Sequence, residues 1–245
     1  MQQEHTVKSF DEELDHLDDT IAEMGRLAES QLVATLDVII KHNKKQAARI
    51  LKADRRLDLL EAEVDKTVVR IIALRQPVAD DLTTSIAALK TASHLERIGD
   101  HIKNIAMRSK VLGKSRAIKD ASHSIANMGG LVREMIVDVM DAYVKKDADK
   151  ADLVRLSDVE VDLCHTSLFR ELLTYMMENP RNITPCSHLL FIAKDIERIG
   201  DHVTSVAEYV HFMVHGKKPE KSRPKSDEAS SVRVDVEDVK TTTPI

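Results

Sequence analysis

The sequence predicts an all-α fold made of two tandem antiparallel three-helix bundles related by pseudo-twofold symmetry. The phrase Glu-Arg-Ile-Gly-Asp-His occurs at residues 96–101 and again at residues 197–202. Six long stretches repeat apolar residues at spacings of three and four, which is typical of one buried face of an α-helix. The 245 residues include only 7 Gly and 6 Pro, which favours long helices over a sheet with many turns.

The internal repeat extends well beyond this phrase. At an offset of 104 residues, the matched pairs are Gly25 with Gly129, Asp37 with Asp141, Asp54 with Asp158 and Asp58 with Asp162. The offset falls to 103 at Pro77 and Pro180, and to 101 at the shared phrase. A period held along most of the chain indicates a tandem duplication of a unit of about 100 residues.

Three helices are expected in the first unit, at residues 8–42, 45–75 and 79–112. The helical period of the first is carried by Leu14, Leu17, Ile21, Met24 and Ala28. Pro77 follows the second helix, as expected soon after a helix end, and Gly113 follows the third.

The second unit repeats this order with helices at residues 117–146, 148–178 and 182–215. Asn179-Pro180 separates the last two, and Gly216 ends the last. Long helices joined by short loops pack antiparallel against one another. We therefore expect one bundle over residues 1–113, a second over residues 114–216, and a disordered polar tail over residues 217–245.

Charge and composition exclude several functional classes. The net charge is -5, so bulk electrostatics do not attract nucleic acid. No run approaches the roughly 18 apolar residues of a membrane span, and the N-terminal residues lack the apolar region of a signal peptide. Two cysteines, Cys164 and Cys186, do not make a disulfide framework. We expect a cytoplasmic protein with reduced thiols.

Each copy of the phrase places acids on one helix face. Glu96, Asp100 and Asn104 form one series at a spacing of four residues, and Glu197, Asp201 and Ser205 form the other. Like charges at this spacing repel by about 0.2–0.5 kcal/mol, and a mid-helix glycine costs about 1 kcal/mol relative to alanine. Two local penalties kept in both units suggest a compensating gain. A hard cation between the carboxylates is one source, and a neighbouring helix packed closely over the glycine is another.

Oxygen ligands suit hard cations such as Mg, Mn or Ca, and carboxylate clusters also hold iron. The alternative is that Arg97, Arg198 or Lys103 pairs with these acids; the doubled phrase favours metal. A second acidic strip consists of Asp54, Asp58 and Glu61 in the first unit; Asp158 and Asp162 are its counterparts in the second, and Glu61 has no acidic counterpart. It could complete the two metal sites or form a solvated face. His101 and His202 follow the Asp of each phrase and suit a role outside the ligand set.

No nucleophile motif and no glycine-rich phosphate loop is found. Ferritin-like di-iron bundles use Glu-x-x-His on two helices. That spacing occurs at Glu13/His16 and at Glu208/His211, but the two pairs are not repeat-equivalent, so we interpret them as coincidence. The alternative to a binding protein is a metal-dependent carboxylate-bundle enzyme, an oxidase or a phosphatase. A metal store is a third class, but two small clusters would hold too few ions.

Two three-helix units that each carry E-R-I-G-D on the last helix resemble the PhoU family of phosphate-signalling regulators. The stretches VRIIALRQPVADDL, residues 69–82, and LLTYMMENPR, residues 172–181, resemble it too. The resemblance covers about residues 8–215 and leaves out the tail. It implies a non-enzymatic negative regulator of phosphate uptake and of the phosphate-starvation response.

The resemblance also implies partners and a metal. The partners are a sensor histidine kinase and the ATPase subunit of a phosphate ABC transporter, which would hold the protein at the inner face of the membrane; homodimers are frequent in the family. The implied metal, Mg, Mn, Zn or Fe, lies on the E-x-x-x-D faces of Glu96, Asp100, Glu197 and Asp201. Asn104 continues the family pattern, whereas Ser205 departs from it.

Overall fold

The computed structural model describes residues 2–41, 43, 50, 55–112, 116–220, 226–229 and 232, with backbone alone for residues 2–11, 116 and 117. The elements of the first unit are α1 (Gln2–Lys41), α3 (Arg55–Arg75) and α4 (Asp80–Ser109). Those of the second are α5 (Arg116–Lys145), α6 (Ala148–Glu178), the short 3-10 helix η1 (Pro180–Asn182) and α7 (Ile183–His215). The predicted all-α fold is therefore confirmed. Most of the predicted stretch 45–54, including Asp54, lies outside the described residues.

The helix ends have local causes. The side chain of Asp147 caps α6 by accepting a 2.9 Å hydrogen bond from the backbone N–H of Lys150. Asn179 and Pro180 turn the chain into α7. Gly216 ends α7 in the left-handed conformation at φ 68°, which glycine adopts without steric cost. The described connections after α3, α5 and α6 are short, so the helices that they join run antiparallel.

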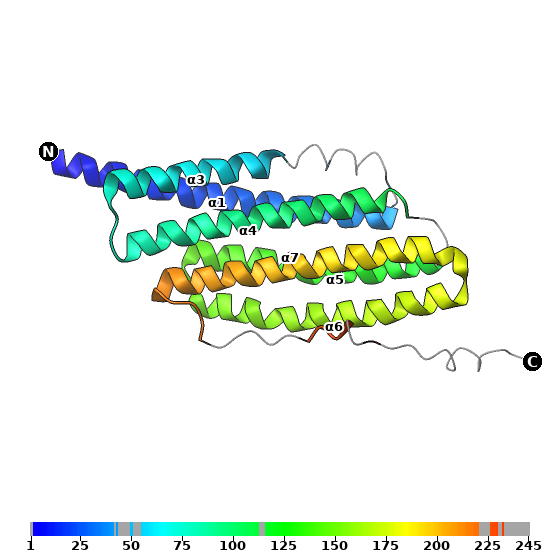
Figure 1. Cartoon of the computed structure of the whole chain (residues 1–245). Helices are drawn as coiled ribbons and strands as arrows, with labels where there is room; N and C mark the ends of the chain where they lie inside the picture. Colours follow the sequence, from blue (N-terminus) through cyan, green and yellow to red (C-terminus); the bar gives the residue numbers. More distant parts are fainter. Residues whose placement is uncertain are drawn as a thin grey trace, which may run out of the picture.

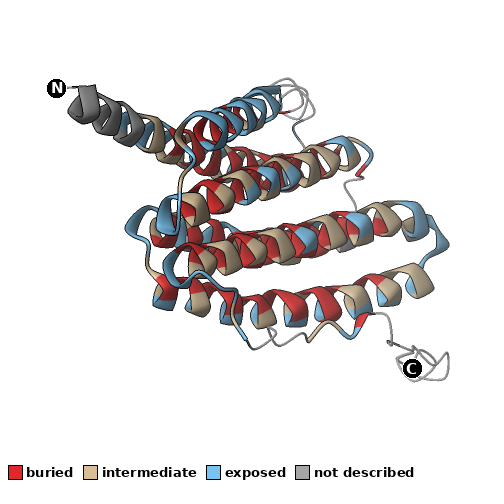
Figure 2. Ribbon diagram, turned by 60° about the vertical axis from the view of Figure 1, so that its left-hand side comes forward, coloured by how far each residue is buried: buried red, intermediate tan, exposed pale blue. Residues whose placement is uncertain are grey.

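The six long helices that the structure describes form two layers of three (Figure 1). Helices α3 and α4 pack on α1, and α6 and α7 pack together with α5. Across the layers, α1 contacts α5 and α4 contacts α7. The buried apolar side chains of both units join in one cluster, and the buried positions line the facing sides of the helices (Figure 2). None of the helices in the described part of the chain could span a membrane.

Two repeat-equivalent contacts between α1 and α5 lie on either side of the pseudo-twofold axis. A methyl group added at Gly25 would lie 2.6 Å from Cγ of Met140, and one added at Gly129 would lie 2.4 Å from Cδ2 of Leu36. Gly25 and Gly129 are repeat-equivalent, and so are Leu36 and Met140. The same contact is therefore made twice in reversed order, as at the interface of a symmetric dimer.

Two further contacts lie near this axis. Arg133 pairs with Glu29 at 2.8 Å, and these residues are repeat-equivalent to each other. The rings of His101 and His202, also equivalent, stack with centroids 5.5 Å apart. The two histidines of the repeated phrase thus lie between the units, away from the acids that precede them.

Neighbouring glycines on α5 test the close approach of α1. Gly130 has open space where a Cβ would be, so Gly130→Ala is expected to stabilise the protein by about 0.5–1 kcal/mol through helix propensity alone. Gly129→Ala has the same propensity gain but crowds Leu36, and overpacking costs about 1–3 kcal/mol. Urea unfolding should find Gly129→Ala the less stable variant. Equal stability of the two variants would contradict this close packing.

Candidate metal-binding faces

The first acid face lies between α3 and α4 and consists of Asp58, Glu61, Glu96 and Asp100. The Glu96 side chain is 20% exposed. Burial, followed by the charges of Asp100 and Glu61, raises the pKa of Glu96 to about 6. Burial, with a contribution from the charge of Asp65, also raises the pKa of Glu61. The face therefore carries carboxylates that repel one another, which is the electrostatic condition under which a cation binds.

Basic neighbours neutralise the first acid face only in part. Arg97 lies 3.9 Å from Glu96 Oε2 and 3.8 Å from Asp100 Oδ2, and its side chain is 62% exposed. Lys103 lies 3.6 Å from Asp100 Oδ1. Exposed pairs at these distances contribute little. The predicted Arg and Lys pairing therefore exists on this face, but it leaves the pKa of Glu96 raised.

The second acid face lies between α6 and α7 and consists of Asp158, Asp162, Glu197 and Asp201. It is more buried than the first: Asp158, Asp162 and Glu197 are 1%, 2% and 4% exposed. A Cβ at Gly200 would lie 2.8 Å from Oδ1 of Asp158, so the glycine of the repeated phrase lets this carboxylate approach the backbone of α7. Close packing over the glycine, one of the two expected gains, is present here.

A lysine on α7 neutralises part of the second acid face. Nζ of Lys194 lies 2.8 Å from Oε2 of Glu197, an ion pair without hydrogen-bond geometry that leaves this buried oxygen without a hydrogen bond. In the first unit the equivalent of Lys194 is Ser93. The two acid faces are thus related by the repeat but differ in charge.

The remaining predicted ligands are distributed unevenly. The hydroxyl of Ser205 donates a 2.9 Å hydrogen bond to the backbone carbonyl of Asp201 on the same helix. Asn104 is half-buried on α4. Asp54, the equivalent of Asp158, lies outside the described residues. Among the residues that the structure describes, no three His, Cys, Asp or Glu side chains form a metal-ligand group. Metal binding therefore remains a prediction.

Two features were missed by sequence reasoning. Nδ1 of His101 donates a 2.9 Å hydrogen bond to Oδ1 of Asp195, and the Nδ1 atoms of His202 and His94 share a hydrogen bond of 3.1 Å. Burial, with smaller effects of His94 and His101, lowers the pKa of His202 to about 4. The second feature is a contact of residues 226–229 with α6 and α7, where the sequence predicted a disordered tail. The helical spacing of apolar residues indicates neither the histidine contacts nor the tail contact, because both join segments that are distant in the sequence.

The two equivalent bundles and their acid faces define an all-α tandem-repeat protein with paired candidate cation sites. The family model described as the PhoU domain matches residues 21–109 and 125–210, one match in each unit. The chain belongs to the PhoU family. Membership of this family of regulatory accessory proteins confirms the prediction that the chain is not an enzyme.

Similar proteins cover most of this chain. A phosphate-specific transport system accessory protein PhoU homolog from Caulobacter vibrioides is 46% identical over 224 residues, which are 91% of this chain and 97% of that protein. A homolog of the same name from Zymomonas mobilis is 48% identical over 90% of this chain and 93% of its own length. The crystal structure of PhoU from Pseudomonas aeruginosa has a TM-score of 0.78 and 32% identity, and covers 85% of this chain and 100% of that one.

The raised pKa of Glu96 predicts a pH-dependent effect on stability. A carboxyl whose folded pKa lies above its unfolded value destabilises the fold when ionised, so stability falls as pH rises from about 4.5 through about 6. In a chelator, Glu96→Gln should raise the melting temperature more at pH 7.5 than at pH 5. Glu134 is exposed, so Glu134→Gln is the control, and it should leave the melting temperature unchanged at both pH values. A gain from Glu96→Gln that is independent of pH would contradict this account.

Proposed function

We propose that this protein is a negative regulator of phosphate uptake and of the phosphate-starvation response. It acts as an adaptor between a phosphate ABC transporter and a sensor histidine kinase. Family membership carries the proposal, because relatives at 46% and 48% identity over most of the chain are accessory proteins of phosphate-specific transport systems. The protein would work in the cytoplasm, at the inner face of the membrane, through these two partners.

Exposed apolar side chains on the outer helices support binding to other proteins. On α3 and the loop that follows it, Leu59, Val69, Leu74 and Val78 are 63%, 66%, 70% and 75% exposed. On α6, Leu153, Leu156 and Leu163 are 64%, 56% and 56% exposed. Exposed apolar groups gathered on a helix are typical of protein contacts. We propose that the outer faces of α3 and α6 receive the transporter ATPase, the kinase or a second copy of the chain in a homodimer.

We also propose that the acid faces bind a divalent or trivalent metal ion. The donor set of carboxylate oxygens suits Mg, Mn or Fe, and Zn also accepts carboxylate ligands. On the first acid face, Glu96 and Asp100 of α4 would hold the ion. Asn104 of α4 or Glu61 of the neighbouring helix α3 would supply a further oxygen ligand. The metal would supply positive charge that joins neighbouring helices, with no catalytic step. The raised pKa of Glu96 and the buried Glu197 oxygen that accepts no hydrogen bond support this role.

Depletion of the protein in its own host tests the regulatory function. In phosphate-rich medium, depletion should raise alkaline phosphatase activity and cellular polyphosphate, because repression of the response and restraint of uptake are both lost. Depletion is preferable to deletion because unrestrained uptake is toxic. Low phosphatase activity after depletion would contradict the proposed regulation of the sensor kinase. Affinity capture from membranes should recover the ATPase or the kinase, and recovery of neither at any phosphate level would contradict the adaptor role.

Thermal unfolding with Mn²⁺ tests the metal. A ligand present at 100 times its dissociation constant stabilises the folded state by about 2.7 kcal/mol. Mn²⁺ should therefore raise the melting temperature of the wild-type protein relative to a chelator. The rise should be smaller for the double variant Glu96→Gln/Asp100→Asn and unchanged for Glu134→Gln. An equal rise in all three proteins would place the ion elsewhere.

A further inference from the structure

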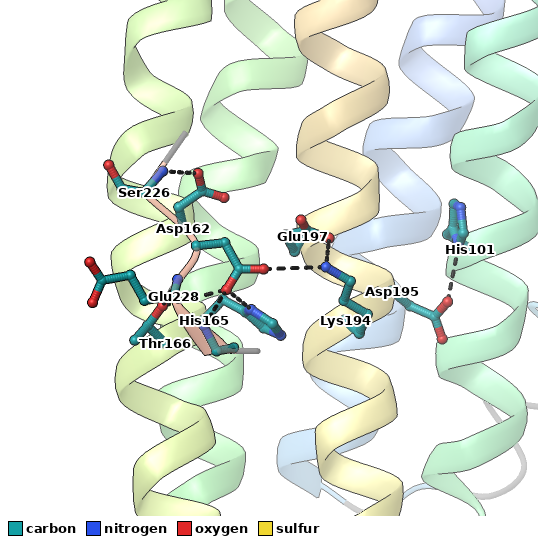
Figure 3. Close-up of polar contacts among 11 residues, drawn as sticks. His101, Asp162, His165, Thr166, Lys194, Asp195, Glu197, Ser226 and Glu228 are labelled. Atoms are coloured by element: carbon teal, nitrogen blue, oxygen red, sulfur yellow. Dashed lines mark hydrogen bonds and ion pairs between the residues drawn. The ribbon is translucent and has the colours of Figure 1, made fainter. Parts of the chain in front are cut away.

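The tail segment, residues 226–229, is bound to α6 through its backbone (Figure 3). The N–H of Ser226 donates a 2.8 Å hydrogen bond to Oδ2 of Asp162. The N–H of Glu228 donates a 3.1 Å hydrogen bond to Oγ1 of Thr166. Asp162 and Thr166 lie one helical turn apart on α6. They therefore hold two backbone groups that bracket the residue between them, Asp227.

The side chain of Asp227 occupies a seat made of two basic groups. Its Oδ1 lies 3.1 Å from Nδ1 of His165, and its Oδ2 lies 3.3 Å from Nζ of Lys194. Its Oδ1 also accepts a 3.0 Å hydrogen bond from the N–H of Ala229. Burial opposes ionisation, but the hydrogen bonds from Ala229 and His165 lower the pKa of Asp227 overall. The carboxylate is thus held in its charged form.

This seat shares groups with the second acid face. Lys194 contacts both Asp227 and Glu197, so one ammonium group lies between the tail segment and the buried carboxylate of α7 (Figure 3). Asp162, a member of the second acid face, accepts the N–H of Ser226 directly. The tail segment therefore engages two of the four acids of this face, one directly and one through a lysine.

The first unit lacks the groups that form the seat. The repeat equivalents of His165 and Lys194 are Glu61 and Ser93. An acidic segment placed there would meet a carboxylate where the second unit has an imidazole, and a hydroxyl where it has an ammonium group. The seat is therefore a property of the second unit alone.

We propose that residues 226–229 are a tethered ligand of the second acid face, and that this segment and a metal ion exclude each other there. The inference rests on the proposed metal binding and assigns it a regulator within the same chain. The first acid face then takes up metal freely, whereas the second does so only when the tail segment leaves.

The physical reason is competition for the same charges. A cation bound by Glu197 and Asp162 would repel the ammonium of Lys194 and replace the N–H donor of Ser226. Once displaced, Lys194 no longer holds Asp227. Because binding linkage is reciprocal, weakening the tail contact must strengthen metal binding by the same factor by which metal weakens the tail contact. If Asp227 instead served as a metal ligand, the coupling would have the opposite sign.

Mn²⁺ binding to the full chain tests the sign of this coupling. All proteins carry Glu96→Gln/Asp100→Asn, which removes the first acid face as a site, and are freed of metal by chelation. Electron paramagnetic resonance of free Mn²⁺ then gives the affinity of the second acid face. Adding Asp227→Asn should tighten binding about fivefold to tenfold, as expected for losing a hydrogen-bonded charge that holds the competitor. Glu220→Gln, which removes an equal charge from an exposed ion pair with Lys217, should leave the affinity unchanged.

Hydrogen exchange of the Ser226 and Glu228 amides gives a second readout. Both amides should exchange faster when Mn²⁺ is added, and faster in Asp227→Asn without metal. Equal or weaker Mn²⁺ binding by Asp227→Asn, or amides slowed by Mn²⁺, would overturn the inference. Absence of Mn²⁺ binding from these variants, with binding retained by the wild-type protein, would overturn it and leave the first acid face as the metal site. Absence of binding from the wild-type protein as well would refute the proposed metal role itself.

Discussion

The contact between the two units across the pseudo-twofold axis is the constraint on which the rest of the structure depends. Each unit places a glycine of its first helix under a large side chain of the other, Gly25 with Met140 and Gly129 with Leu36. This close approach holds α1 on α5, and α4 packs on α7 beside them. Helices α3 and α6 therefore remain on the outer sides, where each forms an acid face with the last helix of its own unit.

Duplication has preserved the geometry of the acid faces without preserving their chemistry. In the first unit, burial together with the charges of Asp100 and Glu61 raises the pKa of Glu96 to about 6. In the second unit Lys194 stands beside Glu197, and the tail segment contacts the same region. On the first face Arg97 and Lys103 offset the carboxylates only in part, whereas on the second face Lys194 pairs with Glu197 and the N–H of Ser226 donates to Asp162. Two sites that look equal in the repeated phrase are therefore expected to respond differently to a cation.

The sequence was sufficient for the fold because its signals are local. Apolar spacing located the helices, Pro77, Pro180 and Gly216 marked their ends, and the doubled phrase indicated two equivalent units. The candidate faces were found in the same way, because residues four apart share one side of a helix. For Gly200, the sequence left open whether a bound cation or a closely packed helix offsets the cost of the glycine. The contact with Asp158 establishes close packing at this position.

Contacts between distant segments could not be predicted by these means. The pairing of His94 with His202 depends on how α4 meets α7, and no spacing within one helix encodes it. The contact of Asp227 with His165 joins residues separated by 62 positions, from a tail whose polar composition favoured disorder. In both cases the decisive interaction is a single polar contact, which leaves no periodic signal in the sequence.

The central claim is that the two units present cation sites of unequal availability, and anomalous X-ray diffraction tests it most directly. Crystals of the full chain would be soaked in Mn²⁺ at a concentration that just saturates the tighter site. The account predicts a strong anomalous peak beside the carboxylates of Glu96 and Asp100, and a weak or absent peak at Glu197 wherever the Asp227–Lys194 contact is intact. A stronger peak at Glu197 with that contact intact, or no peak at either face, would contradict it.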